Sequence, residues 1–332
     1  MSIVITGSIA FDYIMSFPGR FREHILPEKL DSISLSFLVD SMRRERGGVA
    51  PNIAYNLSLL GERPRVMGTV GQDFAEYRAW LEAHNIDTNL ILTINDDFTA
   101  SFFCSTDLNS NQIANFYTGA MSKASLLSFK DTDTSDIELV VISPNDPGAM
   151  VQYVRECHEL GLPYMYDPSQ QIIRLTAQDL REGIAGARVL IVNEYEFGMI
   201  EQKTGLSLEQ ATALADTVII TQGERGSLIV SGAERHEIPA VRARRVADPT
   251  GVGDGYRAGI LKGMLHGYPW PVAGRLGSLV AAYVVEQYGT QNHFFTLPEF
   301  VQRFRDEFGD DRSFEPVMQH ILNFAAKETT SR

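Results

Sequence analysis

The sequence contains little of what a disulfide-held or zinc-held protein needs. Its 332 residues include two cysteines, Cys104 and Cys157, and no Cys-x-x-Cys pair. Two cysteines cannot build a disulfide framework, and structural zinc sites commonly use closely spaced cysteine pairs. We therefore expect two reduced thiols, as is usual in a reducing compartment.

Long apolar runs and a basic leader are also missing. The longest apolar runs, such as residues 279–285, are far shorter than the roughly 18 residues that a membrane helix requires. The chain enters an apolar run at Ile3 with no basic segment or cleavage site before it, which argues against a signal peptide. We therefore expect a soluble cytoplasmic protein with no membrane partner.

The sequence has fewer basic than acidic residues. Lys and Arg total 29 against 42 Asp and Glu, which gives a formal net charge of −13. A field of this sign repels the phosphate backbone of nucleic acid, so we expect no nucleic-acid partner. A small anionic ligand remains compatible with this charge, because a local group of N–H donors and a metal ion can outweigh it.

The composition is that of a folded globular protein, with 44% hydrophobic and 21% charged residues. The length suits one large domain, which we place over residues 1–330. Short β-branched runs without polar alternation are typical of parallel strands buried on both faces, and they occur at residues 3–6, 139–142, 189–192 and 218–221. Amphipathic helical patterns lie between them, so we predict an α/β fold with a doubly wound, mostly parallel sheet flanked by helices. Ligands of such sheets bind at the carboxyl ends of the strands, where polar and turn-forming residues gather in this sequence.

Three further segments depart from this pattern. Residues 31–39, 98–104 and 112–118 alternate apolar and small polar side chains, which predicts exposed strands. No crossover helix separates the last two, so we expect a small antiparallel lid formed by inserted segments at about 13–45 and 95–120. Exposed aromatic residues on such strands invite aggregation unless another surface covers them, so we also expect a homodimer joined through the lid.

The segment 248–259, DPTGVGDGYRAG, combines three features of an anion-binding site. Gly251 and Gly253 allow neighbouring N–H groups to converge, and the positive end of a helix dipole follows directly. Asp254 lies in the first turn of that helix. Such N–H groups can stabilise a transferring phosphoryl group while a carboxylate takes the proton of the attacking hydroxyl. The alternative is that Asp254 only caps the helix next to a glycine turn.

Competing glycine and catalytic motifs are absent from the sequence. There is no Gly-x-x-x-x-Gly-Lys-Ser/Thr segment, which excludes a P-loop enzyme, and Gly7 alone ends the first strand run, so the dinucleotide fingerprint is missing. Neither a Gly-x-Ser-x-Gly elbow nor a His-Glu-x-x-His zinc motif occurs.

The segment 248–254 resembles the signature of the ribokinase-like (PfkB) sugar and nucleoside kinases. Further motifs of that family follow the same order, namely Asp12, Gly47-Gly48 with Asn52, Asn193 to Glu196, and Thr221 to Gly226. Longer stretches, such as 34–40 (SLSFLVD), 117–122 (YTGAMS) and 167–171 (DPSQQ), are similar to the bacterial adenosine kinases of this superfamily. The resemblance covers roughly residues 1–305.

The resemblance implies an ATP-dependent kinase that phosphorylates the 5′-hydroxyl of adenosine, with Mg²⁺ and a monovalent cation such as K⁺. Asp254 would be the general base, and Gly251, Val252 and Gly253 would form the anion hole. Substrate binding would involve Ser8, Asp12, Ser36, Phe37, Gly48, Asn52, Phe102, Phe116, Gln170 and Gln171. Within that set, Asp12, Gly48 and Asn52 would bind the ribose hydroxyls, and the three phenylalanines would sandwich the purine. The nucleotide would contact Asn193, Thr221, Gly223 and Gly226, with Glu196 on Mg²⁺ through water and Asp248 and Thr250 at the monovalent cation.

Several alternatives stay open at this stage. Phe102 and Phe116 could belong to the core, Gln170 and Gln171 could form a solvated loop, and Glu196 could be a surface charge. The acceptor could be a sugar such as ribose or fructose, or another nucleoside such as inosine. A bare sugar needs no aromatic clamp, so Phe102 and Phe116 favour a nucleoside. A binding protein without catalysis on the same scaffold is disfavoured by the intact Asp254 and its glycine loop.

Overall fold

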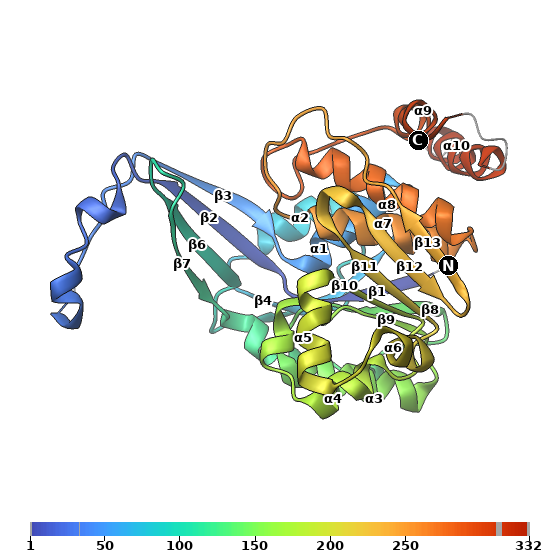
Figure 1. Ribbon diagram of the computed structural model, residues 1–332, viewed down its shortest axis with the longest axis horizontal. Helices are drawn as coiled ribbons and strands as arrows, with labels where there is room; N and C mark the ends of the chain where they lie inside the picture. The colour runs from blue at the N-terminus through green and yellow to red at the C-terminus, as the bar shows by residue number, and fades with distance from the viewer. Residues whose placement is uncertain (1, 33, 310–313, 331–332) are drawn as a thin grey trace.

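A computed structural model describes residues 2–32, 34–309 and 314–330. Within these residues, one nine-stranded sheet has the order β13-β12-β11-β10-β9-β8-β1-β4-β5 (Figure 1). All neighbouring strands run parallel except the β11–β12 and β12–β13 pairs, which confirms the mostly parallel sheet. The strands are β1 (Ser2–Thr6), β4 (Arg65–Gly71), β5 (Ile91–Ile94), β8 (Ile137–Ile142), β9 (Tyr164–Tyr166), β10 (Val189–Asn193), β11 (Thr217–Thr221), β12 (Ser227–Ser231) and β13 (Glu234–Ile238).

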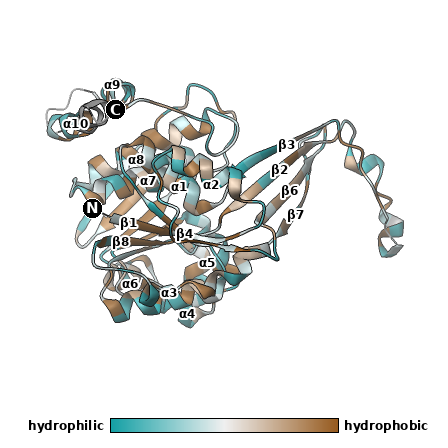
Figure 2. Cartoon of the chain, turned by 180° about the vertical axis from the view of Figure 1, so that it is seen from behind, coloured by the Kyte–Doolittle hydropathy of each residue, from teal (hydrophilic) through white to brown (hydrophobic). Residues whose placement is uncertain are grey.

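Helices cover both faces of this sheet, as a doubly wound fold requires (Figures 1 and 2). One face carries α1 (Val49–Leu59), α2 (Ala75–Ala83), α7 (Val252–Leu265) and α8 (Trp270–Val285). The other carries α3 (Pro147–Leu160), α4 (Ala177–Ile184), α5 (Glu194–Thr204) and α6 (Leu208–Leu214). Side chains of α9 (Leu297–Phe308) and α10 (Glu315–Thr330) share an apolar cluster with α8. Short 3-10 turns span Phe21–Glu23, Pro27–Ser32, Gly119–Leu126, Phe129–Asp131, Ser169–Ile173 and Gly223–Arg225.

The strands of the large sheet are apolar on both faces because each face meets its own layer of helices. In β1, Ile3 and Ile5 join the cluster that contains α1 and α7, while Val4 joins the cluster that contains α3 and α4. The brown strands between the two helix layers in Figure 2 show the same arrangement. The apolar runs without alternation therefore identified the central strands correctly.

Helices α7 and α8 lie in direct backbone contact along a seam of small residues. A Cβ atom on Gly259 would overlap the backbone nitrogen of Gly277, and one on Gly277 would lie 2.8 Å from the carbonyl oxygen of Tyr256. One turn further along α7, a Cβ atom on Gly263 would overlap the side chain of Ala273. Only glycine permits this approach, which fixes the position of α7 against α8.

A second, small sheet stands out from the body with the strand order β3-β2-β6-β7 (Figure 1). Its strands are β2 (Ala10–Ser16), β3 (Ser41–Gly47), β6 (Ala100–Thr106) and β7 (Gln112–Tyr117). The β2–β3 and β6–β7 pairs are antiparallel, and the central β2–β6 pair is parallel. The small sheet predicted from two inserted segments is thus present, and its central pairing joins those segments.

The prediction of a strand over residues 31–39 is wrong. A 3-10 turn ends at Ser32, residues 34–39 have no regular structure, and β3 begins at Ser41. Pairing with β2 starts at Ser41 opposite Ser16, because β2 ends there and earlier residues have no neighbouring strand to bond. Residues 17–32 and 34–40 instead form an arm that projects beyond the small sheet (Figure 1).

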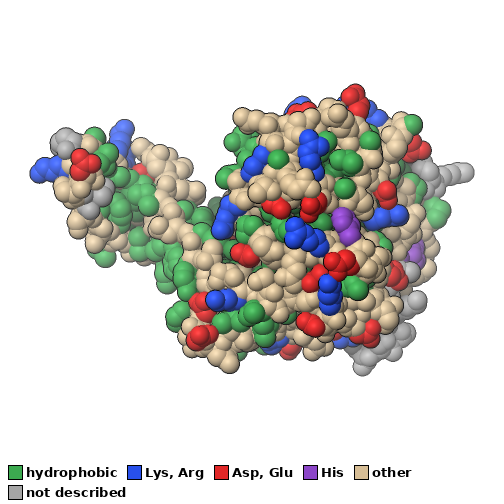
Figure 3. All heavy atoms as spheres, turned by 90° about the horizontal axis from the view of Figure 1, so that it is seen from below, with side chains coloured by type: hydrophobic (Ala, Val, Ile, Leu, Met, Phe, Trp, Pro, Cys, Tyr) green, Lys and Arg blue, Asp and Glu red, His purple; other side chains and the backbone are tan. Residues whose placement is uncertain are grey.

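The arm and the small sheet expose apolar side chains. The most exposed of them is Leu38, at 86%. Large exposed fractions are also found for Leu26 (52%), Leu30 (55%) and Met42 (61%). Figure 3 shows hydrophobic side chains extending from the arm toward the main body. Within the residues that the structure describes, no helix has the length and apolar character needed to traverse a lipid bilayer.

Candidate active site

The glycine segment before α7 forms the helix terminus that the sequence predicts. Gly251 is the N-cap residue, with a left-handed backbone at φ 79°. A Cβ atom there would also lie 2.9 Å from the Thr290 Cγ2 atom, so both conformation and space require glycine. The first N–H groups of α7 have no acceptor within the helix, and the helix dipole adds positive charge at this end. Asp254 lies within this first turn.

Two cavities meet at this helix terminus. The smaller has a volume of about 240 Å³ and the larger about 1,080 Å³. Gly251 and Asp254 line both. Two ligands, one in each cavity, would therefore approach each other beside the Asp254 carboxylate.

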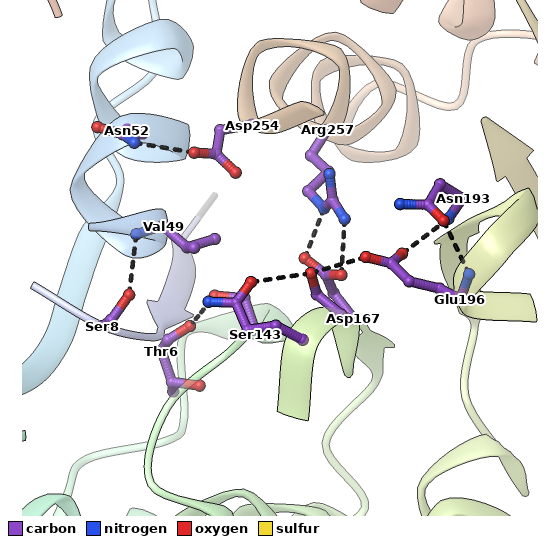
Figure 4. A network of polar contacts seen from close by, with 12 residues as sticks. Thr6, Ser8, Val49, Asn52, Ser143, Asp167, Asn193, Glu196, Asp254 and Arg257 are labelled. Atoms are coloured by element: carbon purple, nitrogen blue, oxygen red, sulfur yellow. Dashed lines mark hydrogen bonds and ion pairs between the residues drawn. The ribbon is translucent and has the colours of Figure 1, made fainter. Parts of the chain in front are cut away.

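The smaller cavity brings together most of the predicted substrate-binding residues, which come from the loop after β1, the start of α1, the small sheet and the 3-10 turn after β9. It is lined by Ser8, Asp12, Gly48, Asn52, Phe102, Phe116, Gln170 and Gln171. Ser8 also has a local role, because its hydroxyl oxygen accepts a hydrogen bond from the Val49 N–H at the start of α1 (3.2 Å, Figure 4). The cavity is also lined by residues that were not predicted, namely Ala10, Val49, Met121, Pro144 and Thr290.

Ser36 and Phe37 do not reach the smaller cavity. Both belong to the arm, where the Phe37 ring packs against Phe17 and Phe21 with centroid distances of 5.0 and 4.9 Å. The remaining two phenylalanines do not form opposite walls either, since Phe102 and Phe116 are direct partners across β6 and β7 and lie on the same face. The predicted sandwich is therefore corrected to a single aromatic wall within one chain.

The larger cavity collects the residues predicted to contact a nucleotide. Asn193, Glu196, Thr221, Gly223, Gly226, Val252 and Gly253 all line it. Asn193 and Glu196 form a reciprocal capping box at the start of α5, each side chain accepting the other's backbone N–H at 2.8 Å (Figure 4). The second Glu196 oxygen accepts a hydrogen bond from the Ser169 hydroxyl at 3.0 Å. Arg242, one of three arginines before Asp248, also lines this cavity.

Asp248 connects two loops beside the smaller cavity. Its carboxylate accepts hydrogen bonds from the backbone N–H groups of Thr250 and Gly289, at 2.9 and 3.1 Å. Thr250 lines the smaller cavity. No cluster of three or more His, Cys, Asp or Glu side chains suited to a metal ion occurs among the described residues.

Burial raises the pKa values of two carboxyl groups in the smaller cavity. Desolvation raises the pKa of Asp254 to about 7, although the Arg257 charge and a hydrogen bond from Asn52 oppose the change. Desolvation also raises the pKa of Asp12 to about 6, and the nearby Asp248 and Glu45 charges add to the effect. A carboxylate with a pKa near neutrality is suited to accept a proton during a reaction.

A buried ion pair lies beneath Asp254 and was not among the predicted residues. The Arg257 Nε and Nη2 atoms donate to the two oxygens of Asp167, at 2.5 and 2.7 Å (Figure 4). Asp167 is fully buried, and Arg257 is 8% exposed. One sequence signal could have identified Arg257, since a charged residue one turn after Asp254 stands among glycine and alanine on a helix packed into the core.

Comparisons with known proteins agree with this geometry. Residues 14–296 match the pfkB family carbohydrate kinase profile. The solved nucleoside kinase of Burkholderia thailandensis in complex with inosine is 40% identical, with a TM-score of 0.83 over 92% of this chain and 98% of that one. A nucleoside kinase of Methanothermobacter thermautotrophicus is 31% identical over 92% of this chain and 96% of its own length. The solved Methanocaldococcus jannaschii nucleoside kinase, an archaeal member of the ribokinase family, is 28% identical, with a TM-score of 0.83 over 92% of this chain and 98% of that one.

The family match spans most of the chain. It includes the helix terminus, Asp254, the lining of the larger cavity, and the lining of the smaller cavity except Ser8, Ala10 and Asp12. The chain therefore belongs to the pfkB family of carbohydrate kinases, with a ribokinase-like fold.

Proposed function

We propose that this kinase transfers the γ-phosphoryl group of ATP to the 5′-hydroxyl of adenosine and gives AMP. The observation that carries the proposal is the position of Asp254, where the two cavities meet beside the N-terminus of α7. The likeness to nucleoside kinases supports a nucleoside as the acceptor.

In this mechanism, each group at the helix terminus has one role. Asp254 takes the proton of the attacking hydroxyl as the oxygen–phosphorus bond forms and the bond to the leaving ADP breaks. The N–H groups of Gly251, Val252 and Gly253 stabilise the charge on the phosphoryl oxygens. Asp12 and Asn52 bind the ribose hydroxyls with an acceptor and an amide.

The base is recognised by the aromatic wall and the two glutamines. A flat purine ring packs against Phe102 and Phe116, and the amides of Gln170 and Gln171 offer both a donor and an acceptor to its edge. Inosine is the second candidate acceptor, because the Burkholderia thailandensis relative is solved in complex with inosine. An amide that turns over can serve either a 6-amino or a 6-oxo purine.

The larger cavity has the residues to hold ATP with Mg²⁺. Its volume of about 1,080 Å³ lies at the upper end of small-molecule sites, and Arg242 provides a positive charge at its wall. Each Glu196 oxygen already accepts one hydrogen bond and keeps a second lone pair, which suits water-mediated rather than direct contact with Mg²⁺. The bound Mg²⁺ would neutralise phosphate charge during transfer. We propose a monovalent cation beside Asp248 and Thr250 on the resemblance to the family alone.

A panel of nucleosides and sugars, each mixed with the protein, ATP and Mg²⁺ and scored by ADP release, tests the proposed acceptor. We expect adenosine to have the highest kcat/KM, inosine to follow, and ribose and fructose to give little turnover. A sugar that outperforms every nucleoside would overturn the nucleoside assignment.

Removing one ring of the aromatic wall should weaken nucleoside binding. We expect Phe102→Ala to raise the adenosine KM by about 5- to 150-fold, because stacking on an aromatic ring is worth about 1–3 kcal/mol per base. The matched control is Ile113→Ala, which truncates a residue of β7 on the opposite face of the small sheet. Equal KM changes in both variants would contradict direct stacking on Phe102.

We also propose that two copies associate through the small sheet and the arm. The outer face of this sheet holds a hollow of about 490 Å³ lined by Tyr13, Phe98, Phe103 and Tyr117 among others. The Tyr13 and Phe103 rings stack there at 4.8 Å. This hollow and the exposed leucines of the arm leave apolar side chains uncovered, and a second copy could bury them.

Sedimentation at micromolar protein concentration tests this association. We expect a dimer, and we expect Leu38→Lys to weaken it at least tenfold, because the lysine would place a charge in the buried contact. Leu160→Lys on α3 adds the same charge to a leucine outside the small sheet and should leave the dimer intact. A wild-type monomer under these conditions would contradict the proposal.

A further inference from the structure

The loop after α8 holds the Asn52 side chain from one side. The Asn52 Oδ1 atom accepts a hydrogen bond from the Gln291 amide at 2.9 Å. The Thr290 hydroxyl lies 2.8 Å from both the Asn52 Oδ1 atom and the Arg46 carbonyl oxygen, and its single proton serves one of them at a time. The Asn52 Nδ2 atom points the other way and donates to the Asp254 Oδ2 atom at 2.8 Å (Figure 4). The same side chain therefore connects this loop to the carboxylate between the two cavities.

Two groups beyond Asn52 decide which end of the Gln291 amide faces it. The Trp80 indole nitrogen can only donate, and it donates to the Gln291 Oε1 atom at 3.2 Å. The Tyr77 hydroxyl donates to the Gly47 carbonyl at 3.0 Å and so offers its oxygen to the Gln291 Nε2 atom at 2.5 Å. Both contacts place the Gln291 N–H groups toward Asn52.

The order of donors and acceptors is thus fixed from Trp80 to Asp254. Asn52, Tyr77, Thr290 and Gln291 are all between 1% and 4% exposed, so water cannot replace a lost partner easily. A turned Asn52 amide would place its N–H groups against the Gln291 N–H group and its oxygen against the Asp254 carboxylate. Such an arrangement leaves buried polar groups unpaired and sets two acceptors against each other.

We propose that Gln291 and Trp80 are positioning residues for phosphoryl transfer, acting through Asn52 to orient and ionise Asp254. The inference rests on the proposed function, in which Asp254 is the general base. Neither residue lines the two cavities, so neither contacts a substrate in this arrangement.

Other charged groups also face Asp254 and must stay constant in a test. These are Asp12 from β2, Asp167 from the loop after β9, and Arg257 from α7 itself. No hydrogen bond joins any of these three charged groups to Gln291 or Trp80 in the structure. A change in pH dependence on substituting Gln291 therefore reports the Asn52 contact.

The test measures the single-turnover rate of phosphoryl transfer from about pH 5.5 to about pH 9.5. In Gln291→Met, we expect the acid limb of the pH–rate profile to shift to higher pH by about one unit. The reason is that Asp254 loses a hydrogen bond that favours its ionised form. With the wild-type limb near neutrality, the rate at pH 7 should fall about fivefold, and the deficit should shrink above about pH 9. Trp80→Phe should give a smaller shift in the same direction, because Tyr77 still orients Gln291.

His293→Asn is the matched control from the same loop. His293 is 1% exposed and its ring contacts Asn56 at 2.8 Å, not the Asn52 side chain. We expect this variant to lower the melting temperature and to keep the wild-type pH profile. If Gln291→Met does not fold, Trp80→Phe and Thr290→Val provide the same test.

A folded Gln291→Met enzyme whose profile superimposes on the wild type would overturn the inference, as would an equal shift in His293→Asn. Both outcomes leave the proposed function intact, since they require an active wild-type enzyme. A wild type without nucleoside-dependent ADP release would instead refute the proposed function.

Discussion

Phosphoryl transfer by the Asp254→Asn variant should be slower than in the wild type by about 10²–10⁴-fold, the usual effect of losing a general base. The amide can still accept the Asn52 hydrogen bond, so the smaller cavity keeps its shape. Adenosine binding measured by calorimetry should therefore change little while the single-turnover rate falls. An unchanged rate would exclude Asp254 as the base.

The same variant should also be more stable than the wild type above about pH 7. The Asp254 pKa rises from 3.8 to about 7 on folding, so the ionised form is destabilising in the folded state. The stability difference should be absent below about pH 4, grow as the pH rises to about 7, and then level off at no more than about 4 kcal/mol. Urea unfolding at several pH values measures it.

Asp12→Asn serves as the comparison. Its carboxyl group also has a raised pKa, about 6, so its substitution should stabilise the fold by a smaller amount. If Asp12 binds the ribose, the adenosine KM should rise more than kcat falls. A stability gain in both variants with a kcat collapse only in Asp254→Asn would separate binding from proton transfer.

The second large effect concerns the buried ion pair. Arg257→Met removes the cation and leaves the Asp167 carboxylate fully buried with neither of its two guanidinium bonds. Breaking a buried pair in this way costs about 3–5 kcal/mol. We expect a loss of this size in denaturant unfolding, together with lower activity near pH 7 because Asp254 loses the charge that favours its ionised form.

The double variant Arg257→Met/Asp167→Leu distinguishes the effect of an unpaired buried charge from the effect of altered side-chain packing. Replacing both partners with apolar groups of similar size can be neutral. We therefore expect most of the stability to return while activity stays low. A single Arg257→Met variant as stable as the wild type would show that Asp167 finds another partner or takes up a proton without cost.

The large sheet and the glycine-rich start of α7 could be predicted because local sequence encodes them. Runs such as 189–192 are apolar on both faces, and the glycines before Asp254 mark a helix terminus that only small residues permit. The resemblance to the kinase family identified Ser8, Gln170 and Asn193, and all three line the cavities because residues at the carboxyl ends of parallel strands meet at one sheet edge.

The parts of the fold and of the site that could not be predicted depend on contacts between segments distant in the sequence. Arg257 and Asp167 are 90 residues apart, and Gln291 and Asn52 are 239 apart, so no local pattern shows either pair. The segment 31–39 alternates as a strand would, yet β2 ends before it could provide a partner. Phe37 consequently packs with Phe17 and Phe21 in the arm and not against a base.

The glycine contact between α7 and α8 determines which parts of the molecule can adapt to a ligand. Two helices that touch through their main chains have no layer of side chains that could rearrange to let one slide along the other. The amides that we propose to bind the phosphoryl group are therefore held in place by helix packing before any ligand arrives. Adjustment to different acceptors must come from the opposite wall, where the inner strand β6 and the edge strand β7 of a separate sheet carry Phe102 and Phe116. Changes of acceptor preference, by evolution or by engineering, should accumulate on those strands and spare the helix.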